Sequence, residues 1–158
     1  MNPTIRLATK EDYAALLPIG LETQEKHADA HPEIFRNGVA GLPEDYFLEH
    51  IDSETQAIYV AEVAGSIVGY VLLEVKDNSF LDILRPRKLV YITDIAVLKT
   101  HQKRGIGHLL FQQSVEWAKG KGAASLNLTV WEFNQDALMF YERHGMKILT
   151  RQMTLPLA

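Results

Sequence analysis

The sequence predicts one mixed α/β domain over residues 1–158, with about six or seven strands in a central sheet and helices on both faces. Two periodicities favour this class. Short apolar or alternating segments are typical of strands, and segments with apolar residues three and four positions apart are typical of helices. The third observation is residues 91–107, where an apolar strand, a basic glycine-containing loop and a helix follow one another. The rest of the chain is organised around this unit.

Composition limits the class of protein. The 158 residues are enough for one sizeable core, and 47% hydrophobic with 23% charged residues is normal for a globular protein. The net charge of -4 argues against general nucleic-acid binding. The absence of cysteine excludes disulfides, a cysteine nucleophile and thiolate zinc sites. No apolar run has membrane-spanning length and no signal peptide is evident, so we expect a cytoplasmic protein with no membrane partner.

The first half of the chain predicts one strand, two helices and a hairpin. Thr9 is the expected N-cap of a helix that continues to about residue 31, and Pro18 predicts a kink or break in it. A proline also opens the second helix. The remaining segments are a first strand at 5–8, the second helix at 43–51, and hairpin strands at 56–63 and 67–75.

The second half predicts three strands and two helices. Asn134 is the expected N-cap of the last helix, and Gly145 is its expected C-cap. The predicted segments are strands at 91–98, 125–131 and 146–155, and helices at 105–119 and 135–143.

The loop before the helix at 105–119 has the chemistry of an anion site. The first turn of a helix leaves N–H groups without internal partners, and glycines at 105 and 107 let an anion approach them. Lys103 and Arg104 add positive charge, so a pyrophosphate fits. An ordinary strand–helix connection with a basic rim is the alternative. The loop lacks the residues of a P-loop and the glycine spacing of a dinucleotide fingerprint.

Two motifs resemble those of the GNAT superfamily of N-acetyltransferases. Residues 102–107, Q-K-R-G-I-G, resemble the Q/R-x-x-G-x-G/A signature, and Ile95-Ala96-Val97 resembles the strand that leads into it. The segment from Asn134 to Met146 resembles N-x-x-A-x-x-x-Y-x-x-x-G-F, with methionine in place of phenylalanine. The resemblance is specific between residues 90 and 146. It implies a GNAT-like fold.

The resemblance implies direct transfer of an acetyl group from the co-substrate acetyl-CoA to a primary amine of a small molecule or peptide. The loop backbone would hold the pyrophosphate, the strand end would hold the pantetheine arm, and an N–H near Val97 would polarise the acetyl carbonyl. Tyr141 would protonate the departing thiolate. The implied cofactor-binding residues are Ile95, Ala96, Val97, Gln102, Lys103, Arg104, Gly105, Ile106, Gly107, His108, Asn134, Ala137 and Tyr141.

Several alternatives remain open at this point. The residues alone are also compatible with Tyr141 as a core tyrosine and with Asn134 as a helix cap only. A non-catalytic acyl-CoA-binding module is the alternative function, although the retained tyrosine favours an enzyme. A homodimer is one expected assembly.

The catalytic base is not given by the resemblance. Some relatives carry a carboxylate at the position of Thr129 and others at that of Tyr91, and this sequence has neither. Asp94, in an otherwise apolar strand, is the candidate for binding or deprotonating the acceptor amine. It could instead be a structural carboxylate that binds a backbone N–H. Glu132 and ordered water are further candidates.

The region between the first two helices commonly shapes the acceptor pocket in this family. The candidate lining residues are Glu22, His27, His31 and Phe35. A capped helix end with one packed aromatic ring explains them equally well. The two histidines, at i and i+4, could hold a metal on a helix, but Pro32 and the lack of a third ligand argue against it, so we expect no metal.

Overall fold

The computed structural model describes residues 2–78 and 81–158. The chain divides into two compact units, Met1–Leu128 and Thr129–Ala158. The first unit contains a five-stranded sheet and three α-helices, and the second contains the fourth helix and an extended segment. No helix among the described residues is both long and apolar enough to cross a bilayer.

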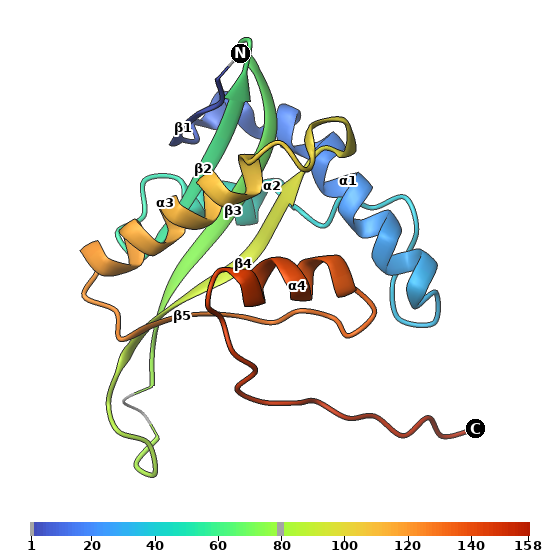
Figure 1. The fold of residues 1–158 in the computed structure, drawn as a ribbon, viewed down its shortest axis with the longest axis vertical. Helices are drawn as coiled ribbons and strands as arrows, with labels where there is room; N and C mark the ends of the chain where they lie inside the picture. Colours follow the sequence, from blue (N-terminus) through green and yellow to red (C-terminus); the bar gives the residue numbers. More distant parts are fainter. Residues whose placement is uncertain (1, 79–80) are drawn as a thin grey trace. The chain divides into compact units, whose positions relative to one another are not determined.

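The sheet has five strands in the described residues, in the order β1-β2-β3-β4-β5 (Figure 1). The first three pairings are antiparallel and β4–β5 is parallel, because a crossover helix separates these two strands along the chain. The strands are β1 (Thr4–Leu7), β2 (Gln56–Val63), β3 (Ser66–Asp77), β4 (Lys88–Val97) and β5 (Ser125–Leu128).

The predicted count of six or seven strands is therefore wrong for the described residues. The strand predicted at 125–131 ends at Leu128, and residues 146–155 form no strand. The latter segment has the composition of a strand, but no described strand pairs with it. A strand exists only where a neighbour accepts its backbone hydrogen bonds.

The helices lie on both faces of the sheet, as predicted. Helices α1 (Tyr13–Ala30) and α2 (Glu44–His50) cover one face, and α3 (Ile106–Gly120) crosses the other (Figure 1). The sequence predicted a kink or break at Pro18, and the break does not occur, because α1 continues through the proline. Leu16 and Ile19 are buried on either side of the proline and hold both turns against the core.

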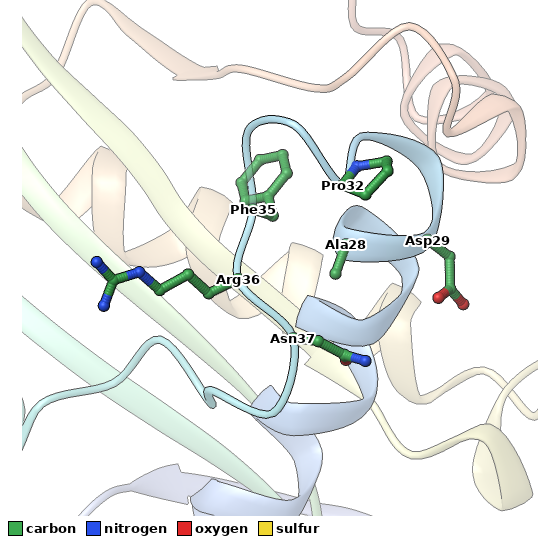
Figure 2. A pocket seen from close by; sticks show the side chains of 6 residues that line it. All are labelled: Ala28, Asp29, Pro32, Phe35, Arg36 and Asn37. Atoms are coloured by element: carbon green, nitrogen blue, oxygen red, sulfur yellow. The ribbon is translucent and has the colours of Figure 1, made fainter.

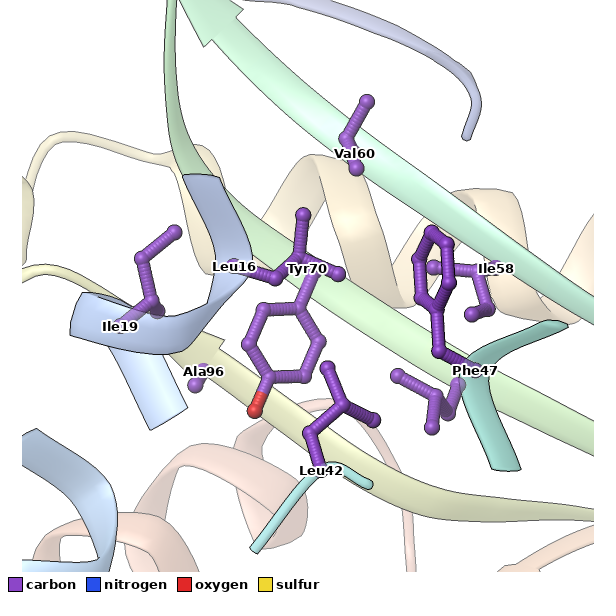
Figure 3. Packing of buried hydrophobic residues seen from close by; sticks show 9 residues of the cluster. Leu16, Ile19, Leu42, Phe47, Ile58, Val60, Tyr70 and Ala96 are labelled. Carbon is purple, nitrogen blue, oxygen red and sulfur yellow. The ribbon is translucent and has the colours of Figure 1, made fainter. Parts of the chain in front are cut away.

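The core between α1, α2 and the sheet is built around the ring of Tyr70 on β3 (Figure 3). This side chain is completely buried, and Figure 3 shows it beside Leu16, Leu42 and Ala96. The cluster consists of Leu16, Ile19, Leu42, Phe47, Ile58, Val60, Tyr70, Leu72 and Ala96. Tyr70 is the member of this cluster with a polar atom, and its hydroxyl takes part in the site described below.

A β-bulge changes the direction of β4. The β3–β4 register shifts so that Ile92 pairs with Leu73 whereas Asp94 pairs with Leu72, which leaves Thr93 as the extra residue. Side chains alternate between the faces of a sheet, so this residue reverses which face each later side chain occupies. Asp94 consequently shares the α1 face with Tyr70. The parallel pairing of β4 with β5 ends at Ile92, directly before the bulge.

In the second unit, α4 runs from Gln135 to Arg143, as predicted. The Asn134 side chain accepts a hydrogen bond from the Ala137 N–H at 3.3 Å. At the other end Gly145 has a φ of +89°, and the Met146 N–H donates to the Tyr141 carbonyl at 3.0 Å. This is the Schellman arrangement, which explains why the helix ends there.

Gly20 permits a close approach between α1 and the core. A Cβ at this position would lie 2.7 Å from the Ala40 carbonyl oxygen and 3.2 Å from the Tyr70 hydroxyl. The first contact is too short and involves backbone that a rotamer change cannot move, and the second is tight. Glycine is thus required here by packing, although it is a poor helix former.

We predict that Gly20→Ala lowers the free energy of unfolding by about 1–3 kcal/mol, the usual result of overpacking. The matched control is Gly120→Ala at the end of α3, where an added Cβ meets nothing within 4 Å. The control should be neutral or stabilise by up to about 1 kcal/mol. Urea denaturation of both variants measures the difference, and a Gly20→Ala variant as stable as the control would contradict the packing described here.

Candidate active site

The carboxylate of Asp94 is held by a buried tyrosine. The Tyr70 hydroxyl donates a hydrogen bond to Asp94 Oδ2, with 2.6 Å between the oxygens. Partial burial raises the pKa of Asp94 above its ordinary value, while the hydrogen bonds from Tyr70 and the Ile95 N–H and the charge of His27 oppose this rise. Burial, followed by the charge of Asp94, raises the pKa of Tyr70. The tyrosine therefore remains a donor at physiological pH.

Of the four residues predicted to line an acceptor pocket, His27 and Phe35 are in contact, and the other two, Glu22 and His31, have partners outside this set. Glu22 Oε2 accepts a hydrogen bond from the Lys99 N–H at 2.9 Å, which ties α1 to the chain after β4. His27 Nδ1 lies 2.8 Å from the Thr23 carbonyl oxygen, and its ring contacts Phe35 edge-on with 5.1 Å between centroids. His31 Nδ1 lies 2.9 Å from a carboxylate oxygen of Glu33.

An open hollow of about 590 Å³ adjoins the end of α1. Figure 2 shows Ala28 and Asp29 on the last turns of the helix, and Phe35 on the loop that follows. Phe35 is the member of the predicted acceptor set that lines this hollow. The complete lining is Ala28, Asp29, Pro32, Phe35, Arg36 and Asn37. It combines both signs of charge with an aromatic ring.

The loop between β4 and α3 leaves backbone N–H groups at the start of α3 open to an anion. Gly105 is the N-cap of α3 with a φ of +84°, and a Cβ there would meet nothing within 4 Å. A glycine N-cap has no side chain to occupy the N–H groups of the first helical turn. The Gln102 side-chain amide donates to the Val97 carbonyl at 2.8 Å, which fixes the loop to the end of β4. Lys103 and Arg104 are exposed beside it.

The predicted site residues fall into two groups. The first unit brings together Asp94, the strand end 95–97 and the loop 102–108 along one stretch of chain. In the second unit Asn134, Ala137 and Tyr141 all belong to α4 and its cap. Within the described residues, no group of three or more histidine, cysteine, aspartate or glutamate side chains is arranged to hold a metal ion.

Sequence reasoning missed Tyr70 and Gly20. Tyr70 was visible as a polar-tipped residue in the centre of an apolar predicted strand, and such a residue needs a hydrogen-bond partner when buried. The identity of the partner depends on the register of β3 against β4. A glycine inside a helical pattern was the signal at position 20.

Comparison with known proteins identifies the class. The model of the acetyltransferase (GNAT) family matches residues 22–146. The chain therefore belongs to the GNAT acetyltransferase family. It is an acetyl-CoA-dependent N-acetyltransferase, which confirms the predicted reaction and favours the enzyme over the alternative of a non-catalytic binding module.

Individual relatives extend the match over most of the chain. The chain is 32% identical over 123 residues to the N-alpha-acetyltransferase of Sulfolobus acidocaldarius, which is 73% of each protein. It is 30% identical over 119 residues to streptothricin acetyltransferase A of Bacillus subtilis, covering 70% of this chain and 66% of that protein. The structure of a tetramutant of the BH1408 protein from Bacillus halodurans superimposes with a TM-score of 0.92 at 29% identity, covering 98% of this chain and 99% of that one.

The raised pKa of Asp94 predicts how stability depends on pH. Because the folded carboxyl binds its proton more tightly than the unfolded one, its contribution to stability is complete below about pH 4, the ordinary pKa, and is lost as pH rises through the folded pKa. Asparagine does not titrate. We therefore predict that the melting temperature of Asp94→Asn rises relative to wild type as the pH increases from 4 to 8.

Thermal unfolding across this pH range measures the effect. The control is Asp52→Asn, because the side chain of Asp52 is 81% exposed, and its difference from wild type should vary little with pH. If the advantage of Asp94→Asn shrank as the pH rose, the hydrogen bonds to the carboxylate would outweigh its burial.

Proposed function

We propose that this acetyltransferase acts on a cationic primary amine, carried by a small molecule or by the N-terminus of a peptide, and that Asp94 receives this amine. The observation that carries the proposal is the short hydrogen bond from the buried Tyr70 hydroxyl to Asp94 Oδ2. This carboxylate is fixed by the tyrosine and lies directly before residues 95–97, the strand end that is predicted to bind acetyl-CoA. It is therefore suited to bind an ammonium group and to take its proton. The names of the two relatives above, one for N-alpha amines and one for streptothricin, support both kinds of amine.

The pyrophosphate of acetyl-CoA binds at the start of α3. The glycine N-cap at 105 leaves room for the anion, and the N–H groups of the first turn from Ile106 to His108 point along the helix axis toward it. Lys103 and Arg104 add charge at the rim. Gln102 keeps the loop attached to Val97 and so sets the position of the site relative to the strand end.

The pantetheine arm lies along the end of β4. The ladder between β4 and β5 ends at Ile92, so the backbone from Ile95 to Val97 has amide groups that take no part in it. These groups bind the amides of pantetheine in the manner of an added strand. The N–H near Val97 then polarises the thioester carbonyl.

The acetyl group is then transferred directly from acetyl-CoA to the amine. The neutral amine attacks the carbonyl carbon, the C–S bond breaks, and the thiolate accepts a proton from the Tyr141 hydroxyl. The nitrogen loses two protons. The first leaves the ammonium group before the attack and goes to Asp94 or, through water, to solvent. The second leaves as the amide forms and returns, through water, to the Tyr141 phenolate. We favour Asp94 over Glu132 because the Glu132 side chain is exposed, whereas Asp94 accepts a hydrogen bond from the buried Tyr70 hydroxyl.

The first functional prediction concerns the anion site. Gly105→Asn keeps the left-handed backbone, which asparagine tolerates, but puts a side chain where the pyrophosphate would lie. We expect acetyl-CoA affinity to fall at least about tenfold. The matched control is Gly65→Asn, in the β2–β3 turn, where φ is +78° and the surroundings are equally open.

Calorimetric titration with acetyl-CoA should show an unchanged affinity for the Gly65→Asn control. Circular dichroism of both variants checks that the fold is intact. Equal affinities for the two variants would place the pyrophosphate elsewhere.

The second functional prediction concerns the acid and the acceptor. A panel of peptides with free N-termini, streptothricin-type and aminoglycoside amines and polyamines is assayed by release of the CoA thiol. We expect turnover with at least one class. On that acceptor Tyr141→Phe should lower kcat by ~10²–10⁴-fold, the usual worth of a general acid, with little change in acetyl-CoA affinity.

Tyr46→Phe on α2 is the control, since Tyr46 has no place in the proposed mechanism. Wild-type turnover by Tyr141→Phe would remove this residue from the chemistry. Binding of acetyl-CoA without transfer to any amine of the panel would overturn the proposed acceptor class.

A further inference from the structure

Asp94 needs a route by which it loses the proton that it takes from the amine. The Tyr70 hydroxyl donates to Asp94 Oδ2, so the core side of the carboxyl is already occupied, and the cluster behind the tyrosine is apolar. The carboxyl is half-buried, and its exposed part is the part to which an acceptor amine would bind. While an acceptor is bound, the proton therefore has to leave toward α1.

The face of α1 that covers this carboxyl contains His27. Gly20 lies against the Tyr70 hydroxyl, since a Cβ there would be 3.2 Å from it. Residues seven apart share a face of a helix, so His27 follows Gly20 on that face two turns later. Helical side chains lean toward the N-terminus, which brings the imidazole back toward Tyr70. Burial raises the pKa of Asp94 and the charge of His27 is among the influences that lower it, so the two groups are close enough to interact.

The other polar side chains on this part of α1 cannot take up the proton. Thr23 and Gln24 share the face with His27, but neither is a base at neutral pH, and the Thr23 hydroxyl donates to a carbonyl of its own helix. The carboxylate of Glu22 accepts the backbone N–H of residue 99 at 2.9 Å. His27 is therefore the side chain of this stretch that is suited to receive a proton from Asp94.

The His27 ring also reaches the open hollow at the end of α1. Its Nδ1 lies 2.8 Å from the Thr23 carbonyl oxygen, which can only accept, so Nδ1 carries a hydrogen and Nε2 is the proton-accepting nitrogen of the neutral ring. The ring contacts Phe35 edge-on, with 5.1 Å between centroids. Phe35 and Ala28, the residue after His27, line the hollow shown in Figure 2. One side chain thus joins the surroundings of Asp94 to solvent.

We propose that His27 acts through Asp94 as a proton relay, which carries the first proton of the acceptor ammonium group to water in the hollow; this inference rests on the proposed function. An N–H bond of the ammonium group breaks as an O–H bond forms on Asp94, and the electron pair stays on the amine nitrogen. This O–H bond then breaks as Nε2 binds the proton, directly or across one bridging water. The imidazolium finally gives the proton to solvent, which restores the carboxylate and the neutral ring for the next acceptor.

The first test is kinetic and uses chemical rescue. The probes are an aminoglycoside, spermidine and a tripeptide with a free N-terminus, and kcat is measured on the probe that the wild type turns over fastest. We expect His27→Ala to lower kcat by about 100-fold, the lower end of acid–base assistance, with little change in acetyl-CoA affinity. Added imidazole fits the space that the ring leaves and should restore most of the lost turnover.

Two controls separate proton transfer from packing. Pyrazole has the same ring size as imidazole but is a far weaker base, so it should fill the space left in His27→Ala without restoring turnover. Lys26→Ala removes a positive charge from the adjacent, exposed position of α1, and it should keep the wild-type kcat. Circular dichroism checks that all variants fold alike.

The second test asks whether His27 acts through Asp94. Asp94→Asn should itself lower turnover, because it removes the group that receives the amine. Since no proton then reaches the carboxyl, adding His27→Ala to this variant should lower kcat by less than about 2-fold further.

The outcomes distinguish the relay from the function on which it rests. Wild-type turnover by Asp94→Asn, or no turnover of any probe by the wild type, would overturn the proposed function and the relay with it. If Asp94→Asn is impaired, the relay alone is overturned by an unchanged kcat in His27→Ala or by additive effects of the two substitutions. It is equally overturned by a loss that imidazole does not restore, or that pyrazole restores as well.

Discussion

The hydrogen bond between the Tyr70 hydroxyl and Asp94 is the interaction on which the arrangement of the first unit depends. It places an ionisable group against the core and requires that the tyrosine ring be enclosed by α1 and the sheet. The helix can come this close only because residue 20 is glycine. Asp94 can reach the tyrosine only because the bulge at Thr93 turns it to the α1 face. A packing constraint, a backbone irregularity and a polar contact are thus coupled in one place.

Sequence reasoning predicted best the helices whose first and last residues are marked by capping residues. The bounds of α4 agree with the structure because Asn134 caps its start and Gly145 permits the left-handed turn at its end. Both signals act within a few residues of the helix. Strand pairing is different, because the partner lies far away in the chain. The segment at 146–155 has the right composition, and composition does not supply a neighbour.

The candidate site shows the same division. The glycine loop before α3 and Asp94 could be recognised from adjacent residues and from the resemblance to a family. The role of Tyr70 could not, because it depends on the register of β3 against β4. In that register Leu72 lies opposite Asp94 only because Thr93 is an extra residue in β4. The acceptor residues stay a prediction. Glu22 is occupied by the Lys99 N–H, and Phe35 lines a hollow with neighbours that no pattern indicated.

The bulge at Thr93 also decides which kinds of genetic change the strand can accept. Substitution of the exposed Thr93 side chain leaves the number of residues unchanged, so Asp94 and Ala96 keep their face. Deletion of the same residue would make β4 a regular strand, but Ile92 would still lie opposite Leu73 and Asp94 opposite Leu72, so each side chain would keep its face. The deletion would remove only the local bend and the extra twist that a bulge adds to a strand. Homologous chains that retain this arrangement should therefore tolerate both substitution and loss of this one residue, whereas loss of an adjacent paired residue would shift the register.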